Sequence, residues 1–346
     1  MDGTIALFLI QDGVINGAVY ALVGMALVLV FAVSRVILVP QGEFVAFAGL
    51  TLAALEAGRI PSTPWLLLAL GVLAAISDVI RARFRLQLRR LVRIALLDLV
   101  MPLALVALTK LVAPMRLGQT VDILLTLALI VPMGPMIYRV AFEPLAQASV
   151  LVLLIASFGV HLSLMGLGLG FFGPEGVGTP PLAPGSFDVG ALVVTGQSIV
   201  VLATTVALVI LFAWLSERTL FGKALRACSS NRLGARLVGI PTAIAGRAVF
   251  AIAALLGAVA GVLVSPIVTI YYDSGFLLGL KAFVAAILGG LLSYPLTVAA
   301  AILVGLFESF SSFFASAYKD ALVFTLIIPV LVWRSLRSAT PESGRE

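Results

Sequence analysis

The chain has 346 residues, of which 62% are hydrophobic and only 11% are charged, and its formal net charge is +6. Ordinary soluble domains contain about 25% charged residues, so this composition excludes a soluble domain. Cations that flank membrane helices explain the positive charge, and no nucleic-acid partner is needed. The single cysteine, Cys228, excludes an internal disulfide framework and a cysteine-rich metal site.

Apolar runs that approach the length of a membrane helix, about 20 residues, recur along the whole chain. We therefore predict an all-α polytopic integral membrane protein with about 10–11 transmembrane or re-entrant helices. The predicted spans are residues 13–33, 43–58, 64–80, 94–113, 121–138, 148–171, 197–215, 247–268, 279–292, 296–312 and 320–333.

Two of these spans, 43–58 and 279–292, are shorter than the roughly 17 residues that a membrane helix needs. Each begins near a glycine and a charged residue, Gly42-Glu43 in the first and Gly279 with Lys281 in the second. Short spans in both halves of a chain often mark a transport pathway. Their ends could instead be misplaced, or the helices could tilt little in a thin bilayer.

The distribution of Lys and Arg predicts the orientation of the chain. With the N-terminus outside and the C-terminus cytoplasmic, 17 of the 22 cations fall on the inner side. Residues 1–13 contain Asp2 and Asp12 but no cation, unlike the positive start of a cleaved signal peptide. Residues 171–196 have no cation and many Pro and Gly residues, which predicts an irregular external loop.

Two segments carry most of the predicted inner charge. The first, residues 81–93, contains six arginines inside an apparent extra helical pair near 78–125. It suits either a plain inner-side anchor or an interfacial helix on anionic lipid, and Asp78 should pair there with Arg81. The second, residues 216–247, is basic but rich in Ala and Leu, which predicts a helical cytoplasmic segment.

The sequence offers little sign of catalysis. His161 is the only histidine and lies among apolar residues, which predicts a satisfied buried or interfacial side chain. No zinc-protease, serine-hydrolase or paired-cysteine motif occurs, and no glycine-rich phosphate loop precedes a lysine. We predict no catalytic residue, no metal and no ATP hydrolysis by this chain.

Ionisable residues inside membrane spans are the remaining functional candidates, because burying a charge in the bilayer is costly. Glu308 is the best candidate for a polar lining, since it is deep and is followed by Ser309, Ser311 and Ser312. Lys281 is a candidate partner for it. Lys319 and Asp320 should pair with each other or extend to the outer surface.

Several segments resemble the permease subunits of bacterial ABC importers for branched-chain amino acids, a family that also handles amides and urea. The similar segments, in order, are DGVINGAVYALVGMALVLVFAVSRVI with QGEF, YRVAFEPL, LFGKALRACSSNRLGARLVGI, GFLLGLKAFVAAILGGLLSYPL, VGLFES and SAYKDALVF. The resemblance covers most of the chain, and the C-terminal group is its most specific part.

The resemblance implies a single permease domain, 1–346, in the bacterial inner membrane. It implies two ATPase subunits that use ATP and Mg, a second related permease, an external solute-binding protein and surrounding lipids as partners. Residues near 216–247 would then couple to the ATPase, with Lys223, Arg226, Asn231, Arg236 and Gly239 as candidates. The pathway candidates are Gln41, Gly42, Glu43, Lys281 and Glu308.

The sequence departs from the family pattern in places that bear on the cargo. Leu38, Pro40 and Gln41 replace the usual residues before Gly42-Glu43, and Ser229, Ser230 and Asn231 replace acidic ones. LLSYP, with Leu291 and Leu292, replaces the usual Gly-Ser-Ile-Pro. An amide, urea, an aromatic acid, a sugar or a nucleoside therefore stays open as the cargo. The competing functions are an ion-coupled secondary transporter, a membrane enzyme and a non-transporting scaffold.

Overall fold

The computed structural model describes residues 3–81, 88–190, 192–291 and 293–338. In these ranges eight helical segments are long and apolar enough to span a membrane. They are Gly3–Ser34, Thr63–Arg81, Leu91–Met115, Gln119–Phe142, Val150–Phe172, Gly196–Arg218, Thr242–Val264 and Tyr294–Phe314. The expectation of an all-α polytopic membrane protein is therefore confirmed.

The elements follow one another along the chain with short connections. The first half contains α1 (Gly3–Ser34), α2 (Gln41–Glu56), α3 (Thr63–Arg81), α4 (Leu88–Ile94), η1 (Ala95–Val100), α5 (Met101–Val112), η2 (Ala113–Met115), α6 (Gln119–Ile130), α7 (Met133–Ile137), η3 (Tyr138–Phe142) and α8 (Val150–Phe172). The second half contains β1 (Ser186–Val189), β2 (Leu192–Thr195), α9 (Gly196–Arg218), α10 (Leu220–Ser230), α11 (Arg232–Leu237), α12 (Thr242–Val264), α13 (Ser274–Leu288), α14 (Tyr294–Phe314), η4 (Ser316–Tyr318), α15 (Lys319–Thr325) and α16 (Ile327–Ser338).

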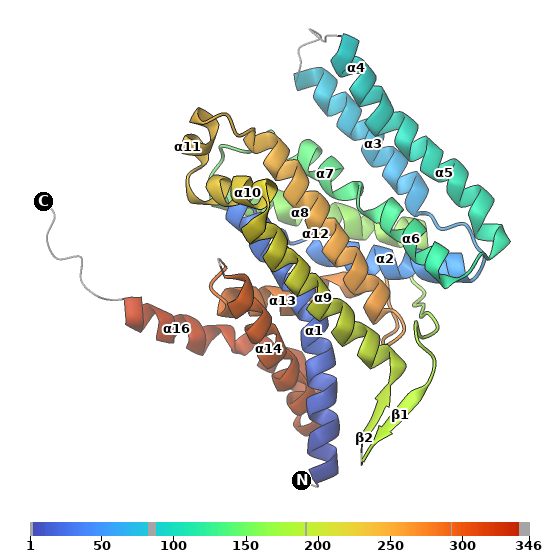
Figure 1. Ribbon diagram of the computed structural model, residues 1–346, viewed down its shortest axis with the longest axis vertical. Helices are drawn as coiled ribbons and strands as arrows, with labels where there is room; N and C mark the ends of the chain where they lie inside the picture. Colours follow the sequence, from blue (N-terminus) through green and yellow to red (C-terminus); the bar gives the residue numbers. More distant parts are fainter. Residues whose placement is uncertain (1–2, 82–87, 191, 292, 339–346) are drawn as a thin grey trace, which may run out of the picture.

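Two helices form the centre of the bundle. In the most apolar 18-residue stretch of each helix, 83% of the residues of α1 and 67% of those of α12 are buried. The corresponding share is only 22% in Leu91–Met115, α8 and α9. Figure 1 shows α1 running beside α13 and α14, while α3, α4 and α5 stand together at one edge of the molecule. The apolar outer faces of these peripheral helices are the surfaces available to lipid or to a partner.

Helices α1 and α14 run antiparallel, and their backbones come into close contact at glycine residues. A Cβ atom on Gly305 would lie 2.2 Å from the carbonyl oxygen of Gly13, and one on Gly17 would lie 2.7 Å from the Cα of Ile302. Small residues allow helix backbones to approach this closely where lipid provides no hydrophobic drive. Any larger side chain at Gly305 would force the two helices apart.

The two predicted short spans are short helices in the structure. Helix α2 has 16 residues and α13 has 15, and α2 packs against α12. A Cβ atom on Gly261 of α12 would lie 2.2 Å from the carbonyl oxygen of Val45 in α2. The glycines at both ends of the GAVAG segment, residues 257–261, therefore bring α12 against α2.

Some predicted boundaries and one predicted loop are wrong. Helices α12 and α13 begin at Thr242 and Ser274, about five residues before the predicted spans. The more polar residues that precede each apolar run are also helical, and the apolar pattern does not mark them. The predicted span 320–333 is divided between α15 and α16. Segment 171–196, expected as an irregular external loop, is not wholly irregular, since β1 and β2 pair antiparallel within it, and Gly190 at φ 66° lies in the turn.

Residues 78–125, where an extra helical pair was expected, contain the end of α3, the rod formed by α4, η1, α5 and η2, and the start of α6; that this region is an addition to the family pattern stays a prediction. The middle of the arginine-rich run, residues 82–87, lies outside the described residues, as do Leu292 and the chain end at Arg345. The orientation of the termini across the membrane stays a prediction.

Candidate functional site

A buried polar site is centred on Glu43, in the first turn of α2. The Glu43 side chain is fully buried, and its Oε1 atom lies 2.6 Å from Nδ1 of His161 in α8. The imidazole stacks on Phe276 of α13, with ring centroids 4.5 Å apart. The second Glu43 oxygen, Oε2, has no hydrogen-bond partner in the described chain. Two helices distant in sequence therefore position one carboxylate that keeps an acceptor available.

Gln41 adds a second available acceptor to this site. Its Nε2 atom donates to the carbonyl oxygen of Ala253 at 2.9 Å, while its buried Oε1 has no partner within the described residues. A buried acceptor without a donor costs about 1–3 kcal/mol, so such groups are rare unless a ligand or water completes them. The expectation that His161 is a satisfied buried side chain is confirmed, with Glu43 as its partner.

The starts of the two short helices meet at this site. A Cβ atom on Gly42 would lie 1.8 Å from the carbonyl oxygen of Gly275, and one on Gly279 would lie 3.2 Å from the Gly42 nitrogen. The N-terminal ends of helices carry partial positive charge. The junction thus combines two positive helix ends with the carboxylate of Glu43, and it leaves no room for a side chain between the backbones.

A second polar cluster is centred on Glu308 of α14. Its Oε1 atom accepts from Nζ of Lys281 at 2.6 Å, and its Oε2 atom accepts from the hydroxyl of Tyr20 in α1 at 2.5 Å. Lys281 also lies 2.8 Å from Oδ1 of Asp320. The proposed partnership of Lys281 and Glu308 is confirmed as a contact. Of the two alternatives for Lys319 and Asp320, the described residues show no pairing between them, since Lys281 reaches the Asp320 carboxylate; extension of Lys319 to the outer surface stays a prediction.

Helix α13 belongs to both polar sites. Gly275 and Gly279 face α2, whereas Lys281 reaches Glu308 on α14. Residues two positions apart on a helix point in nearly opposite directions, so Gly279 and Lys281 serve opposite faces. The five predicted pathway residues therefore fall into two groups joined by α13, with Gln41, Gly42 and Glu43 in one and Lys281 and Glu308 in the other.

A third cluster of charges binds the peripheral helices to the bundle. Arg139 donates to both oxygens of the fully buried Asp98, one of them at 2.9 Å, and lies 3.2 Å from Asp78. Asp78 also pairs with Arg81 at 3.4 Å, as predicted. Glu143 completes the cluster by pairing with Arg81 at 3.3 Å and with Arg247 at 2.9 Å. These pairs involve four separate segments of the chain.

The closest pair in this cluster, Arg139 with Asp98, joins two π-helical turns. Asp98 lies in η1, which interrupts the helical segment Leu91–Met115, and Arg139 lies in η3, which ends the segment Gln119–Phe142. A π turn inserts an extra residue and so changes the direction of the side chains that follow it. The two insertions let an acid and a base inside apolar helices face each other.

The predicted coupling segment forms two short helices, α10 and α11, joined at Asn231. The Oδ1 atom of Asn231 accepts a hydrogen bond from the Gly234 nitrogen at 2.9 Å and thus caps the start of α11. Arg236 donates to Thr242 at 3.0 Å, and Gly239 has φ 85° in the turn that follows. These three candidates shape the segment itself, while Lys223 is exposed on α10.

Large apolar side chains are exposed on the same segment. Leu220, Leu237 and Val238 are 85%, 80% and 77% exposed, and Leu233 is 69% exposed. The sequence interpretation relied on the cations and did not single out these residues. Their exposure on a short polar-flanked segment is typical of a surface that a partner covers.

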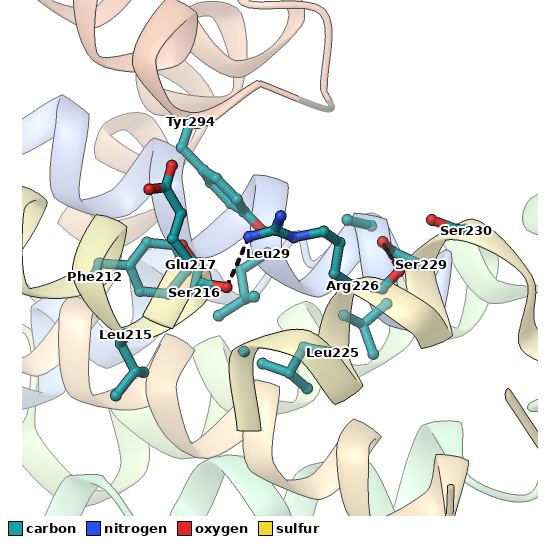
Figure 2. A pocket seen from close by; sticks show the side chains of 13 residues that line it. Leu29, Phe212, Leu215, Ser216, Glu217, Leu225, Arg226, Ser229, Ser230 and Tyr294 are labelled. Carbon is teal, nitrogen blue, oxygen red and sulfur yellow. Dashed lines mark hydrogen bonds between the residues drawn. The ribbon is translucent and has the colours of Figure 1, made fainter. Parts of the chain in front are cut away.

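A pocket of about 390 Å³ lies behind α10. Figure 2 shows Arg226 extending across it, where the guanidinium donates to the carbonyl oxygen of Ser216 at 2.8 Å. Phe212 of α9 and Tyr294 of α14 form its other side, with ring centroids 4.9 Å apart. The pocket therefore joins α10 to the ends of the helices that carry the polar sites.

Comparison with known proteins identifies the family. The model of the branched-chain amino acid transport system permease component matches residues 90–331. The chain belongs to this family. The chain is 33% identical over 207 residues to the LivH permease proteins of Escherichia coli K12 and Salmonella typhimurium, which covers 58% of this chain and 67% of each relative. It is 32% identical over 208 residues to BraD of Pseudomonas aeruginosa, with 58% of this chain and 68% of that protein covered. This protein is thus a multi-pass membrane permease component.

Sequence reasoning missed two features of these sites. The Glu43–His161 pair joins residues 118 positions apart, and the only signal was that the sole histidine lay in a membrane span. The Arg139–Asp98 pair had a comparable signal, an isolated acid in the predicted span 94–113. Among the described residues, no group of three or more His, Cys, Asp or Glu side chains is arranged to hold a metal ion.

Proposed function

We propose that this chain is a transmembrane permease subunit of an ATP-driven importer for branched-chain amino acids in the bacterial inner membrane. Its partners would be two ATPases that use ATP and Mg, a second related permease and an external solute-binding protein. Membership of the family supports the transport role, and the names of the LivH and BraD relatives support the cargo. This chain itself would hold no cofactor.

The exposed segment α10–α11 is the observation that carries the proposal. An importer driven by ATP needs a surface on which the ATPase docks and through which its motion reaches the membrane helices. The exposed Leu233 and Leu237 provide the surface, and the pocket behind α10 borders α1, α9 and α14. A secondary transporter has no need for such a surface.

We place the cargo pathway at the junction of α2 and α13. An amino acid carries an ammonium and a carboxylate, which need an acceptor and a positive group respectively. The free oxygens of Glu43 and Gln41 suit the ammonium, and the helix ends at Gly42 and Gly275 suit the carboxylate. Since the backbones touch there, the junction must separate for cargo to pass.

Uptake measurements test the cargo and the energy source together. A strain that lacks this gene should lose high-affinity uptake of labelled leucine, isoleucine and valine and should recover it with the intact gene. Uptake should persist when an ionophore removes ion gradients and stop when ATP is depleted. Loss of uptake with the ionophore alone would instead support an ion-coupled transporter. Competition by an amide or urea, but not by leucine, would reassign the cargo.

Cysteine crosslinking tests the docking surface. Cysteines at Leu233 or Leu237 should crosslink to cysteines on the ATPase, whereas one at exposed Leu169, near the C-terminal end of α8, should not. The native Cys228 gives little background, because it is buried and burial raises the pKa of its thiol. Failure of every pair on α10–α11, with uptake intact, would refute docking through this segment.

A further inference from the structure

A pocket of about 380 Å³ opens between the peripheral helices and the bundle, near the start of α4. Its lining includes Asp78, Arg89, Arg93, Arg139 and Arg247, and we call it the arginine pocket. The apolar side chains of Ile94 and Leu97 complete the wall on the α4–η1 side. Four of the five ionisable side chains that line the pocket are therefore cationic.

The charges around the arginine pocket do not balance. Arg81, Arg139 and Arg247 are matched by the three carboxylates of Asp78, Asp98 and Glu143 in the ion pairs already described. Arg89 and Arg93 are additional, and no carboxylate of the described chain lies within ion-pair distance of either. The neighbouring residues 82–87 contain no acidic residue in the sequence. The pocket thus has an excess of two positive charges.

The two additional arginines have the geometry of an anion site. Arg89 and Arg93 are one helical turn apart, so they lie on the same face of α4. Both are exposed, while Arg139 on the opposite wall is held in place by Asp98 and Asp78. Planar guanidinium groups match the oxygens of a phosphate and bind it through paired hydrogen bonds.

We propose that the arginine pocket binds the phosphate of an anionic phospholipid headgroup. The pocket lies at the start of Leu91–Met115, an apolar helix that is only 22% buried. The exposed Leu96, Val100 and Leu103 continue from the pocket along this helix and give the acyl chains an apolar surface. A basic pocket at the end of a lipid-facing helix suits a headgroup better than a free ion.

Lipid-dependent stabilisation of the purified full-length protein tests this inference. Phosphatidylglycerol, phosphatidylcholine or inorganic phosphate is titrated into detergent-solubilised protein while its melting temperature is measured. The variant Arg89→Gln/Arg93→Gln removes two charges from the pocket. The matched control Arg59→Gln/Arg116→Gln removes one charge just after α2 and one just before α6, at the opposite end of the Leu91–Met115 helix from the arginine pocket. Size-exclusion chromatography establishes that each variant is folded.

Phosphatidylglycerol should raise the melting temperature of the intact protein, whereas phosphatidylcholine and phosphate should not. The pocket variant should need roughly thirtyfold more phosphatidylglycerol, corresponding to about 2 kcal/mol, and the control should match the intact protein. An unchanged response of the pocket variant, or an equal loss in the control, would overturn the proposal. A response to inorganic phosphate as large as that to phosphatidylglycerol would also overturn it, in favour of a soluble anion.

Discussion

Glu43 and Glu308 are both buried carboxylates in the membrane region, yet their surroundings differ in one respect. Glu308 accepts hydrogen bonds at both oxygens, from Tyr20 and Lys281. Glu43 is bonded at one oxygen to His161, and its other oxygen has no partner in the described residues. A carboxylate with hydrogen-bond donors at both oxygens connects the helices that supply those donors. A carboxylate with one free oxygen can still accept a hydrogen bond from a ligand. The two glutamates therefore have different roles: Glu308 stabilises helix packing, and Glu43 is the candidate for ligand binding.

The largest effect should come from Lys281→Met. This change leaves the buried Glu308 charge with only the Tyr20 hydroxyl, and an uncompensated buried charge costs about 3–5 kcal/mol. Thermal unfolding of the purified protein should show a large loss of stability. The double variant Lys281→Met/Glu308→Gln should recover part of that loss. Equal stability of the single and double variants would show that Glu308 does not depend on Lys281.

Asp98→Asn tests whether another fully satisfied carboxylate behaves like Glu308. Arg139 would lose its closest charge partner but would keep Asp78, so the cost should be smaller, about 1.5–3 kcal/mol. Hydrogen exchange should rise in α4 and α5, which this pair fastens to the bundle. Exchange that is unchanged there would assign the docking of α4 and α5 to apolar packing alone.

Glu43→Gln should lower uptake strongly while lowering the stability of the protein only slightly. The amide can still bond to His161, so unfolding should become easier by only about 1 kcal/mol. Loss of the charged acceptor should lower leucine uptake about tenfold, corresponding to about 1.4 kcal/mol of binding. Glu56→Gln, at the other end of α2, is the matched control and should keep normal uptake. Normal uptake by Glu43→Gln would remove Glu43 from the pathway.

Asp320→Asn should have the smallest effect. Its side chain is 39% exposed, and ion pairs in contact with water contribute at most about 1 kcal/mol. The melting temperature should therefore fall only slightly, and uptake should be retained. A loss as large as that of Lys281→Met would show that Asp320, rather than Glu308, holds Lys281.

The sequence predicted the parts of this molecule that depend on local composition. Apolar runs located the helices, and their lengths distinguished α2 and α13 from full spans. Pairs such as Glu43 with His161 or Asp98 with Arg139 were not predictable, because packing of distant helices brings them together. The π turns were also missed, since hydrophobic periodicity gives no sign of one inserted residue. The exposed Leu233 and Leu237 escaped notice because exposure depends on the tertiary fold.

The placement of α13 has a mechanical consequence. This helix is short, and its two faces are engaged at once, by backbone contact with α2 and by an ion pair with α14. Separating α2 from α13 therefore requires either that α14 travels with α13 or that the Lys281–Glu308 bond breaks. The first route keeps the Lys281–Glu308 ion pair, so α13 and α14 would move together against α2. It would also move α14 relative to α1 and break the hydrogen bond from the Tyr20 hydroxyl to Glu308, so opening of the junction would disturb the close contact of α1 with α14 at Gly305 as well.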